Sequence, residues 1–203
     1  NPIPSFIGHK ISNMFFYKNR LGFTSEENVI LSEVGGFFNF FSTTAMDILD
    51  SDMIDVAVDS DTVANIRNVN STAGALTLWS DKGQFMMTGG EVLSPTTVRV
   101  SQTSSYDSDS SLSPLVLDNE IIFFNKNGSN LEVSSFSPAS VQDDRTSANS
   151  ISSHIPTYIT SNVDCIALSS ATNIVLLLES GTNILYAYRY HIQSQQRVLS
   201  SWF

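Results

Sequence analysis

Cysteine, basic residues and long apolar runs are all scarce in this sequence. The single cysteine, Cys165, excludes a disulfide within the chain and a metal site built from several thiolates. It lies in the apolar run 163–168, so we expect a small buried side chain, as for most free cysteines. The longest apolar run, Ile174–Leu178, is far shorter than the ~20 residues of a membrane-spanning helix. No membrane-spanning segment is therefore expected.

Acidic residues outnumber basic residues two to one in this sequence. Ten Lys and Arg stand against twenty Asp and Glu, which gives a formal net charge of −10. Non-specific binding of nucleic acid depends on basic side chains that displace counterions from phosphates. The composition therefore argues against a protein that holds nucleic acid, and the simplest role of the surplus acid is solubility.

Patterns typical of catalysis and metal binding are missing as well. The sequence has no Gly-rich phosphate loop, no G-x-S-x-G and no H-E-x-x-H. The three histidines, His9, His154 and His191, have no His or Cys partner at metal-ligand spacing. The acidic run 47–61 lacks the glycine and the closing glutamate of a calcium loop, which indicates a solvated loop. We expect no enzyme activity, no catalytic residue, no cofactor and no metal.

A weak repeat organises what is present. In each copy an apolar strand, a polar turn of about four residues and a second apolar strand follow one another. In the last three turns, SDKG, NKNG and ESGTN, Gly or Asn is expected to supply the positive φ that short hairpins need. The turn centres lie near residues 26, 82, 127 and 181, so the steps are 56, 45 and 54 residues. The copies are residues 21–32, 76–87, 121–134 and 175–188.

This repeat predicts an all-β fold of antiparallel, β-propeller-like blades that form a partial propeller with long polar loops. Propeller repeats are ~40–50 residues long, and a single blade cannot bury its own faces. A β-sandwich suits the many short strands too. We expect exposed loops at 102–113 and 137–153 and one helical turn at 44–49. We treat 1–203 as one β-propeller-type segment, because the sequence alone indicates no internal boundary.

The strongest local pattern is a hairpin followed by phenylalanines. Strands at 21–24 and 29–31 flank the turn 25–28, and the chain then reaches four aromatic residues. These side chains suit the core between blades or a contact between subunits, because exposed aromatic patches are rare on monomers and common at interfaces. The candidate interface aromatics are Phe37, Phe38, Phe40 and Phe41.

One turn favours a different function. The segment Trp79–Phe85, WSDKGQF, is similar to the Asp box of sialidase-type propellers, although its spacing is compressed and no other blade repeats it. A carbohydrate-binding or glycan-cleaving β-propeller is therefore the alternative hypothesis. A generic propeller scaffold is the third hypothesis. The sequence does not contain the repeated Trp-Asp signature that would support it.

Six segments that follow the stretch 1–41 in collinear order belong together. They are DMIDVAV (52–58), LTLWSDKGQFMMTG (76–89), EVLSPTTVRV (91–100), SSHIPTYI (152–159), NILYAYRYHI (183–192) and the final SSW. With the stretch 1–41, they resemble the tail nozzle protein of short-tailed bacteriophages, also called tail tubular protein B. Little matches between residues 101 and 113 and between 125 and 144.

The resemblance implies a structural virion protein. Such proteins assemble as homohexamers in the host cytoplasm into the distal tail tube, or nozzle, through which the genome is ejected into the host. They join a tail adaptor ring, carry tail fibres and have no known catalytic site. The resemblance, the initial Asn1 and the unfinished strand at Trp202 lead us to expect an internal piece of a longer chain.

A conduit for double-stranded DNA should repel its cargo rather than bind it in a sequence-specific way. The acidic run lies beside the phenylalanines, so we hypothesise that part of it faces the channel or a seam between subunits. The candidate acids are Asp50, Asp52 and Asp55.

Overall fold

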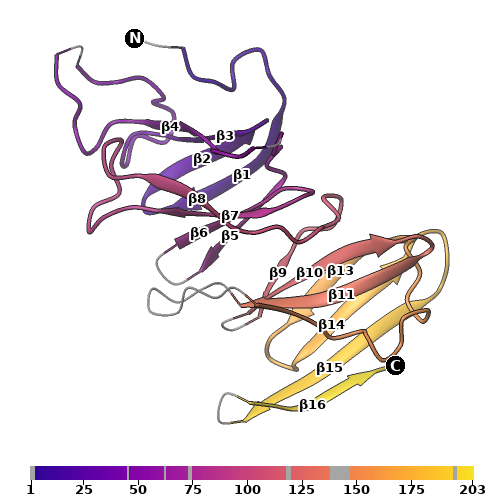
Figure 1. Cartoon of the computed structure of the whole chain (residues 1–203). Coiled ribbons are helices and arrows are strands. Elements are labelled where there is room, and N and C mark those ends of the chain that lie inside the picture. Colours follow the sequence, from indigo (N-terminus) through magenta and orange to yellow (C-terminus); the bar gives the residue numbers. More distant parts are fainter. Residues whose placement is uncertain are drawn as a thin grey trace. The chain divides into compact units, whose positions relative to one another are not determined.

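The computed structural model describes residues 3–44, 46–61, 63–72, 75–117, 120–137, 147–193 and 196–203. This described part contains four antiparallel sheets of four strands each (Figure 1). We number them sheets I to IV in chain order. The chain divides into two compact units, of which Asn1–Ser110 holds sheets I and II and Ser111–Phe203 holds sheets III and IV.

Every sheet is a meander in which consecutive strands are neighbours. Sheet I comprises β1 (Ile11–Tyr17), β2 (Arg20–Ser25), β3 (Asn28–Leu31) and β4 (Ile54–Ala57); sheet II comprises β5 (Asn68–Thr72), β6 (Ala75–Trp79), β7 (Gln84–Thr88) and β8 (Arg99–Ser104). Sheet III comprises β9 (Leu115–Leu117), β10 (Glu120–Asn127), β11 (Asn130–Ser137) and β12 (Ser147–Ser150); sheet IV comprises β13 (Val163–Ser169), β14 (Ile174–Glu179), β15 (Leu185–Gln193) and β16 (Gln196–Trp202).

The four predicted hairpins are the central hairpins of the four sheets. They are formed by β2 and β3, β6 and β7, β10 and β11, and β14 and β15. The turn chemistry is as expected in sheets III and IV, where Gly128 and Gly181 have φ angles of 62° and 69°. It differs in the other two, because Gly83 does not take a positive φ in the turn between β6 and β7, and Glu26, with a φ of 52°, takes it in the turn between β2 and β3. An L side chain rarely adopts such angles, whereas glycine does so without strain. The prediction of an all-β antiparallel fold is confirmed.

Unit 1 buries apolar side chains on both faces of sheet I. Successive residues of a strand point to opposite faces, so Val29 and Leu31 enter one cluster and Ile30 enters another. The first cluster joins sheet I to Leu76, Leu78, Phe85 and Met87 of sheet II. The second places Leu21, Ile30 and Phe40 together, with Phe6, Phe23 and Phe37 packed against them.

Unit 2 has a core between sheets III and IV, and Ile121, Phe123 and Phe136 are buried on the opposite face of sheet III. Ile122, Phe124, Leu131 and Val133 from sheet III pack with Val175, Leu177, Tyr186, Tyr188 and Tyr190 from sheet IV. The residues between them in sequence point to the opposite face of each sheet. Asn130 and Glu132 in β11 lie on that opposite face of sheet III, and Leu176 and Leu178 in β14 lie on that of sheet IV.

Two local predictions are wrong and two hold only in part. Strand β8 extends to Ser104, and β12 lies at Ser147–Ser150, so parts of both predicted polar loops are edge strands; residues 138–146 lie outside the described residues. The described residues of 44–49 form an irregular loop instead of a helical turn. Cys165 is exposed, because it points to the outer face of β13.

No helix in the described part of the chain is long and apolar enough to cross a membrane.

Candidate functional site

A two-residue turn places the side chain around which the acidic loop is built. Strand β1 ends at Tyr17 and β2 begins at Arg20, and the two residues between them, Lys18 and Asn19, have φ angles of 45° and 60°. Positive φ at both central residues is the geometry of a type I′ hairpin turn, which matches the twist of the flanking strands. The turn directs Arg20 into the protein, where the residue is 0% exposed.

Arg20 binds backbone carbonyl oxygens from three parts of unit 1. Its Nη1 donates to the carbonyl of Ser32 at 2.8 Å, of Ser51 at 3.3 Å and of Asp52 at 2.6 Å. Its Nη2 donates to the carbonyl of Asp50 at 2.8 Å and of Leu93 at 3.2 Å. The planar guanidinium therefore fixes the end of the loop 32–53 to β2 and to the connection that follows β7.

The charge of Arg20 is buried among neutral carbonyl groups. Burial lowers the pKa of Arg20 below its usual value, and the negative charges of Asp52 and Glu33 oppose that shift. An arginine side chain stays protonated in proteins. A permanent cation thus lies under the acidic loop and compensates part of its negative charge.

The carboxylate of Asp52 holds the same loop from the other side. Asp52 is 2% exposed, and its side-chain oxygens accept hydrogen bonds from the amide of Leu49 at 2.9 Å and of Thr43 at 3.1 Å. The pKa of Asp52 is lowered, chiefly by the Leu49 amide; burial raises it, and the contacts with Thr43 and the charge of Arg20 lower it further. Asp52 therefore organises the loop through its ionised form.

These contacts predict an acid-sensitive loop. Because the folded pKa of Asp52 lies below the unfolded value of about 3.9, its ionised form stabilises the fold above that pH. This contribution is lost as the pH falls through the folded pKa. We expect Asp52→Asn to cost about 1–3 kcal/mol at pH 7 and less at lower pH, because it weakens hydrogen bonds to a charged acceptor.

Thermal unfolding of the two proteins between pH 7 and pH 2 measures this difference. Asp50→Asn is the matched control, because the Asp50 side chain is exposed and a surface substitution changes stability by less than about 0.5 kcal/mol. Parallel pH profiles for Asp52→Asn and the unmodified chain would show that the carboxylate does not stabilise the loop.

The structure does not bring the three candidate acids together as one surface. Asp52 is buried, whereas the side chain of Asp50 is exposed and only its carbonyl contacts Arg20. Asp55 lies half-buried in β4, where its carboxylate accepts a hydrogen bond from the amide of Ser5 at 2.8 Å. Of the three, only Asp50 presents its charge freely to solvent.

Two of the four candidate aromatics are packed within unit 1. The ring of Phe40 stacks on Phe23 with centroids 5.3 Å apart and meets the ring of Phe6 edge-on at 5.2 Å. Phe37 is half-buried and meets Phe16 edge-on at 5.5 Å. Both residues belong to, or pack against, the cluster on the second face of sheet I.

The other two, Phe38 and Phe41, are exposed. Phe38 is 93% exposed, which is unusual for so large an apolar side chain. Met14 and Phe16 of β1, both 65% exposed, are further exposed apolar residues that we did not single out from the sequence. They are two residues apart in a strand and so lie on one face, and this spacing is the signal that could have identified them.

A second exposed apolar surface lies on the outer face of sheet IV. Leu178 of β14 pairs with Cys165 of β13 and with Leu185 of β15, and all three side chains are exposed. Leu199 of β16 and Phe203, which follows that strand, are exposed as well. The outer face of sheet IV is therefore open, whereas its inner face forms the core of unit 2.

The histidine and acidic side chains of the described residues lie apart from one another or in simple pairs. Among them, no group of three or more His, Cys, Asp or Glu could hold a metal ion. His9 pairs with Glu26, with 3.1 Å between Nδ1 and the carboxylate, and both side chains are largely exposed.

Comparison with known proteins identifies the family. The profile of the bacteriophage nozzle protein family matches residues 1–203. The chain belongs to that family. It is also 30% identical over all 203 residues to the tail tubular protein gp12 of Escherichia phage T7, and it spans about a quarter (26%) of that protein.

Membership of the nozzle family makes the chain a structural component of the virion tail. The resemblance inferred from the sequence is confirmed over the whole segment. For a nozzle protein, the relevant features are the exposed apolar residues Phe38, Met14 and Phe16, the open face of sheet IV, and the loop that Arg20 and Asp52 hold in place.

Proposed function

We propose that the chain forms part of the wall of the distal tail tube, the nozzle, through which the phage genome is ejected into the host. The observation that carries the proposal is the match to the nozzle family along residues 1–203, together with 30% identity to a tail tubular protein. The tube is a homohexamer that joins the tail adaptor ring and carries tail fibres. This assembly occurs in the host cytoplasm.

The four sheets act as propeller-type blades in this proposal. They support it because each is a four-stranded antiparallel meander, and because sheets pack face to face within each unit. The exposed Leu178 and Leu185 indicate that sheet IV packs against a further sheet in the assembled protein. Burying such a face follows the general rule that a sheet covers its apolar side with another layer.

The exposed apolar residues of unit 1 supply the contact between subunits. Phe38 is fully available for such a contact, since its own chain hardly covers it. Aromatic residues and Met are enriched in interfaces, where they bury a large area. In this proposal Phe40 and Phe37 hold the segment on sheet I and Phe38 and Phe41 project from it.

Asp50 is the acid that this proposal assigns to the channel or a subunit seam. We expect virions with Asp50→Lys to eject DNA more slowly at low salt and to recover at high salt, because added cations bind phosphates and salt weakens that binding. Time-resolved DNA release from purified virions measures both rates.

Asp50→Asn is the matched control, because it removes the carboxylate without adding a cation. Its ejection rate should stay close to that of the unmodified virion at both salt concentrations. Equal rates for Asp50→Lys and Asp50→Asn in normally assembled virions would place Asp50 away from the DNA.

A further inference from the structure

A strap, residues 151–161, lies beside β11 and borders an open hollow on the surface of unit 2. Near the tip of the hairpin, the amide of Leu131 donates to the carbonyl of Ile159 at 2.9 Å, and the amide of Ser161 donates to that of Ser129 at 2.9 Å. At the other end, the amide of Ile151 donates to the carbonyl of Val133 at 2.9 Å. The strap 151–161 is thus hydrogen-bonded to the hairpin of β10 and β11 at both of its ends.

Between its two ties the strap bends away from the strand. The amide of Ile155 donates to the carbonyl of Ser152 at 2.9 Å, and the amide of Tyr158 donates to that of Ile155 at 3.0 Å. These two backbone hydrogen bonds have both their donor and their acceptor inside the strap. A hollow of about 420 Å³ is left between strap and hairpin, within the range of about 300–1,000 Å³ that small-molecule pockets occupy.

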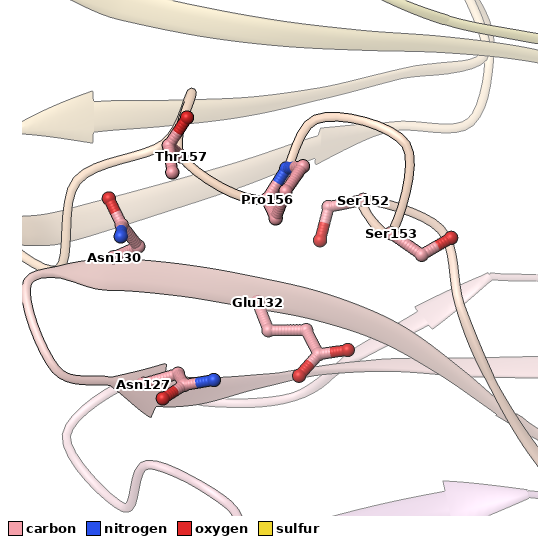
Figure 2. A pocket seen from close by; sticks show the side chains of 7 residues that line it. All are labelled: Asn127, Asn130, Glu132, Ser152, Ser153, Pro156 and Thr157. Carbon is pink, nitrogen blue, oxygen red and sulfur yellow. The ribbon is translucent and has the colours of Figure 1, made fainter.

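Polar side chains surround this hollow. Figure 2 shows three of them on the hairpin and the others on the strap facing it. On the hairpin, Asn127 pairs with Asn130, and Glu132 is two residues further along β11, so all three point to the same face. The lining residues are Asn127, Asn130, Glu132, Ser152, Ser153, Pro156 and Thr157.

Several of these side chains have unused hydrogen-bonding capacity. Within the described part of the chain, the side chains of Asn127, Asn130, Glu132 and Thr157 make no hydrogen bond or ion pair. The neighbouring Ser152 is different, since its hydroxyl accepts the amide of Val133 at 2.9 Å and so fixes the strap. A ligand therefore meets a set of donors and acceptors that the described part of the chain does not use.

From this arrangement we propose that the hollow binds a neutral sugar unit. Two amides, a carboxylate and a hydroxyl offer donors and acceptors side by side, and each sugar hydroxyl both donates and accepts. Pro156 supplies a small apolar wall for the C–H face of a sugar ring. The sugar is free in solution or part of a cell-surface polysaccharide, and the chemistry of recognition is the same.

The same residues exclude other classes of ligand. An anion is repelled by Glu132 and finds no Lys, Arg or His among the lining residues. A flat aromatic ligand finds no ring to stack on. A Ca²⁺ ion takes six to eight oxygen ligands, commonly from several carboxylates, and the hollow offers one carboxylate and two side-chain amide oxygens.

In this proposal the site binds a sugar but does not cleave a glycosidic bond. Hydrolysis of a glycosidic bond by the usual mechanism needs two carboxyl groups placed about 5–10 Å apart. Glu132 is the single carboxylate of the hollow. The inference goes beyond the nozzle function and does not depend on it, since it rests on the geometry of unit 2.

Saturation-transfer NMR of the chain tests the site, with a panel of neutral mono- and disaccharides and, in a separate arm, purified polysaccharide from the bacterial surface. We expect transfer to at least one sugar of the panel. In the variant Asn127→Ala/Glu132→Ala the affinity should fall at least about tenfold, because the ligand loses hydrogen bonds to an amide and to a charged group. Transfer to the polysaccharide alone would assign the site to surface glycans.

The matched control is Asn149→Ala/Asp164→Ala, which removes an exposed amide and an exposed carboxylate elsewhere in unit 2. This variant should bind as the unmodified chain does, and circular dichroism checks that both variants fold. Absence of transfer in both arms, or equal transfer with the Asn127→Ala/Glu132→Ala variant, would overturn the proposal.

Discussion

Arg20→Met is expected to lower the free energy of unfolding of unit 1 by about 3–5 kcal/mol, the range for breaking a buried charged network. Methionine fills much of the space but donates no hydrogen bond. The carbonyl oxygens of Ser32, Asp52 and Leu93 would then lose a donor inside the protein. Each buried polar group left without a partner costs about 1–3 kcal/mol.

Urea unfolding followed by circular dichroism and Trp fluorescence measures this loss. The variant Arg20→Lys tests whether the charge or the geometry of the side chain matters. Lysine keeps the positive charge but lacks the planar guanidinium with its several N–H donors, so we expect most of the loss of stability to remain. Arg189→Met is the control, because Arg189 is exposed on β15. A loss below about 1 kcal/mol for Arg20→Met would mean that the loop does not depend on this residue.

Phe40 and Phe38 are expected to respond in opposite ways. Phe40→Ala removes a ring packed against Phe23 and Phe6 and should cost about 3–4 kcal/mol, as large-to-small changes in cores do. Phe38→Ala removes a ring that is 93% exposed and should change stability by less than about 0.5 kcal/mol. Thermal unfolding of the two variants under one condition measures both effects.

For assembly we expect the opposite order, with Phe38→Ala having the larger effect. In the full-length nozzle protein we expect Phe38→Ala to reduce ring formation strongly, because truncating a central aromatic anchor often costs an interface 2 kcal/mol or more, about a thirtyfold change in affinity. Size-exclusion chromatography with light scattering gives the oligomer fraction. Rings that form equally well with Phe38→Asp would show that this residue lies outside the seam.

The central hairpins could be predicted because their signals are local. An apolar run, a Gly or Asn turn and a second apolar run are adjacent in sequence, as in β10 and β11. The edge strands give no such signal. Residues 147–150, SANS, form β12 by backbone pairing with β11, and serine side chains neither favour nor reveal that pairing.

The candidate site was harder to predict because its contacts join distant residues. Arg20 contacts carbonyls between 12 and 73 residues away, and nothing in the local sequence YKNR indicates more than a turn. The run FFNFF has no strand or helix period, so sequence could not tell that Phe40 is buried and Phe38 exposed. Asp52 likewise looked like any other acid of its run.

Electron microscopy of the purified full-length nozzle protein, with and without its tail adaptor, tests the central claim most directly. The proposed wall of a tail tube predicts rings or short tubes with six-fold symmetry and an open centre. Particles that stay separate even with the adaptor present would contradict it.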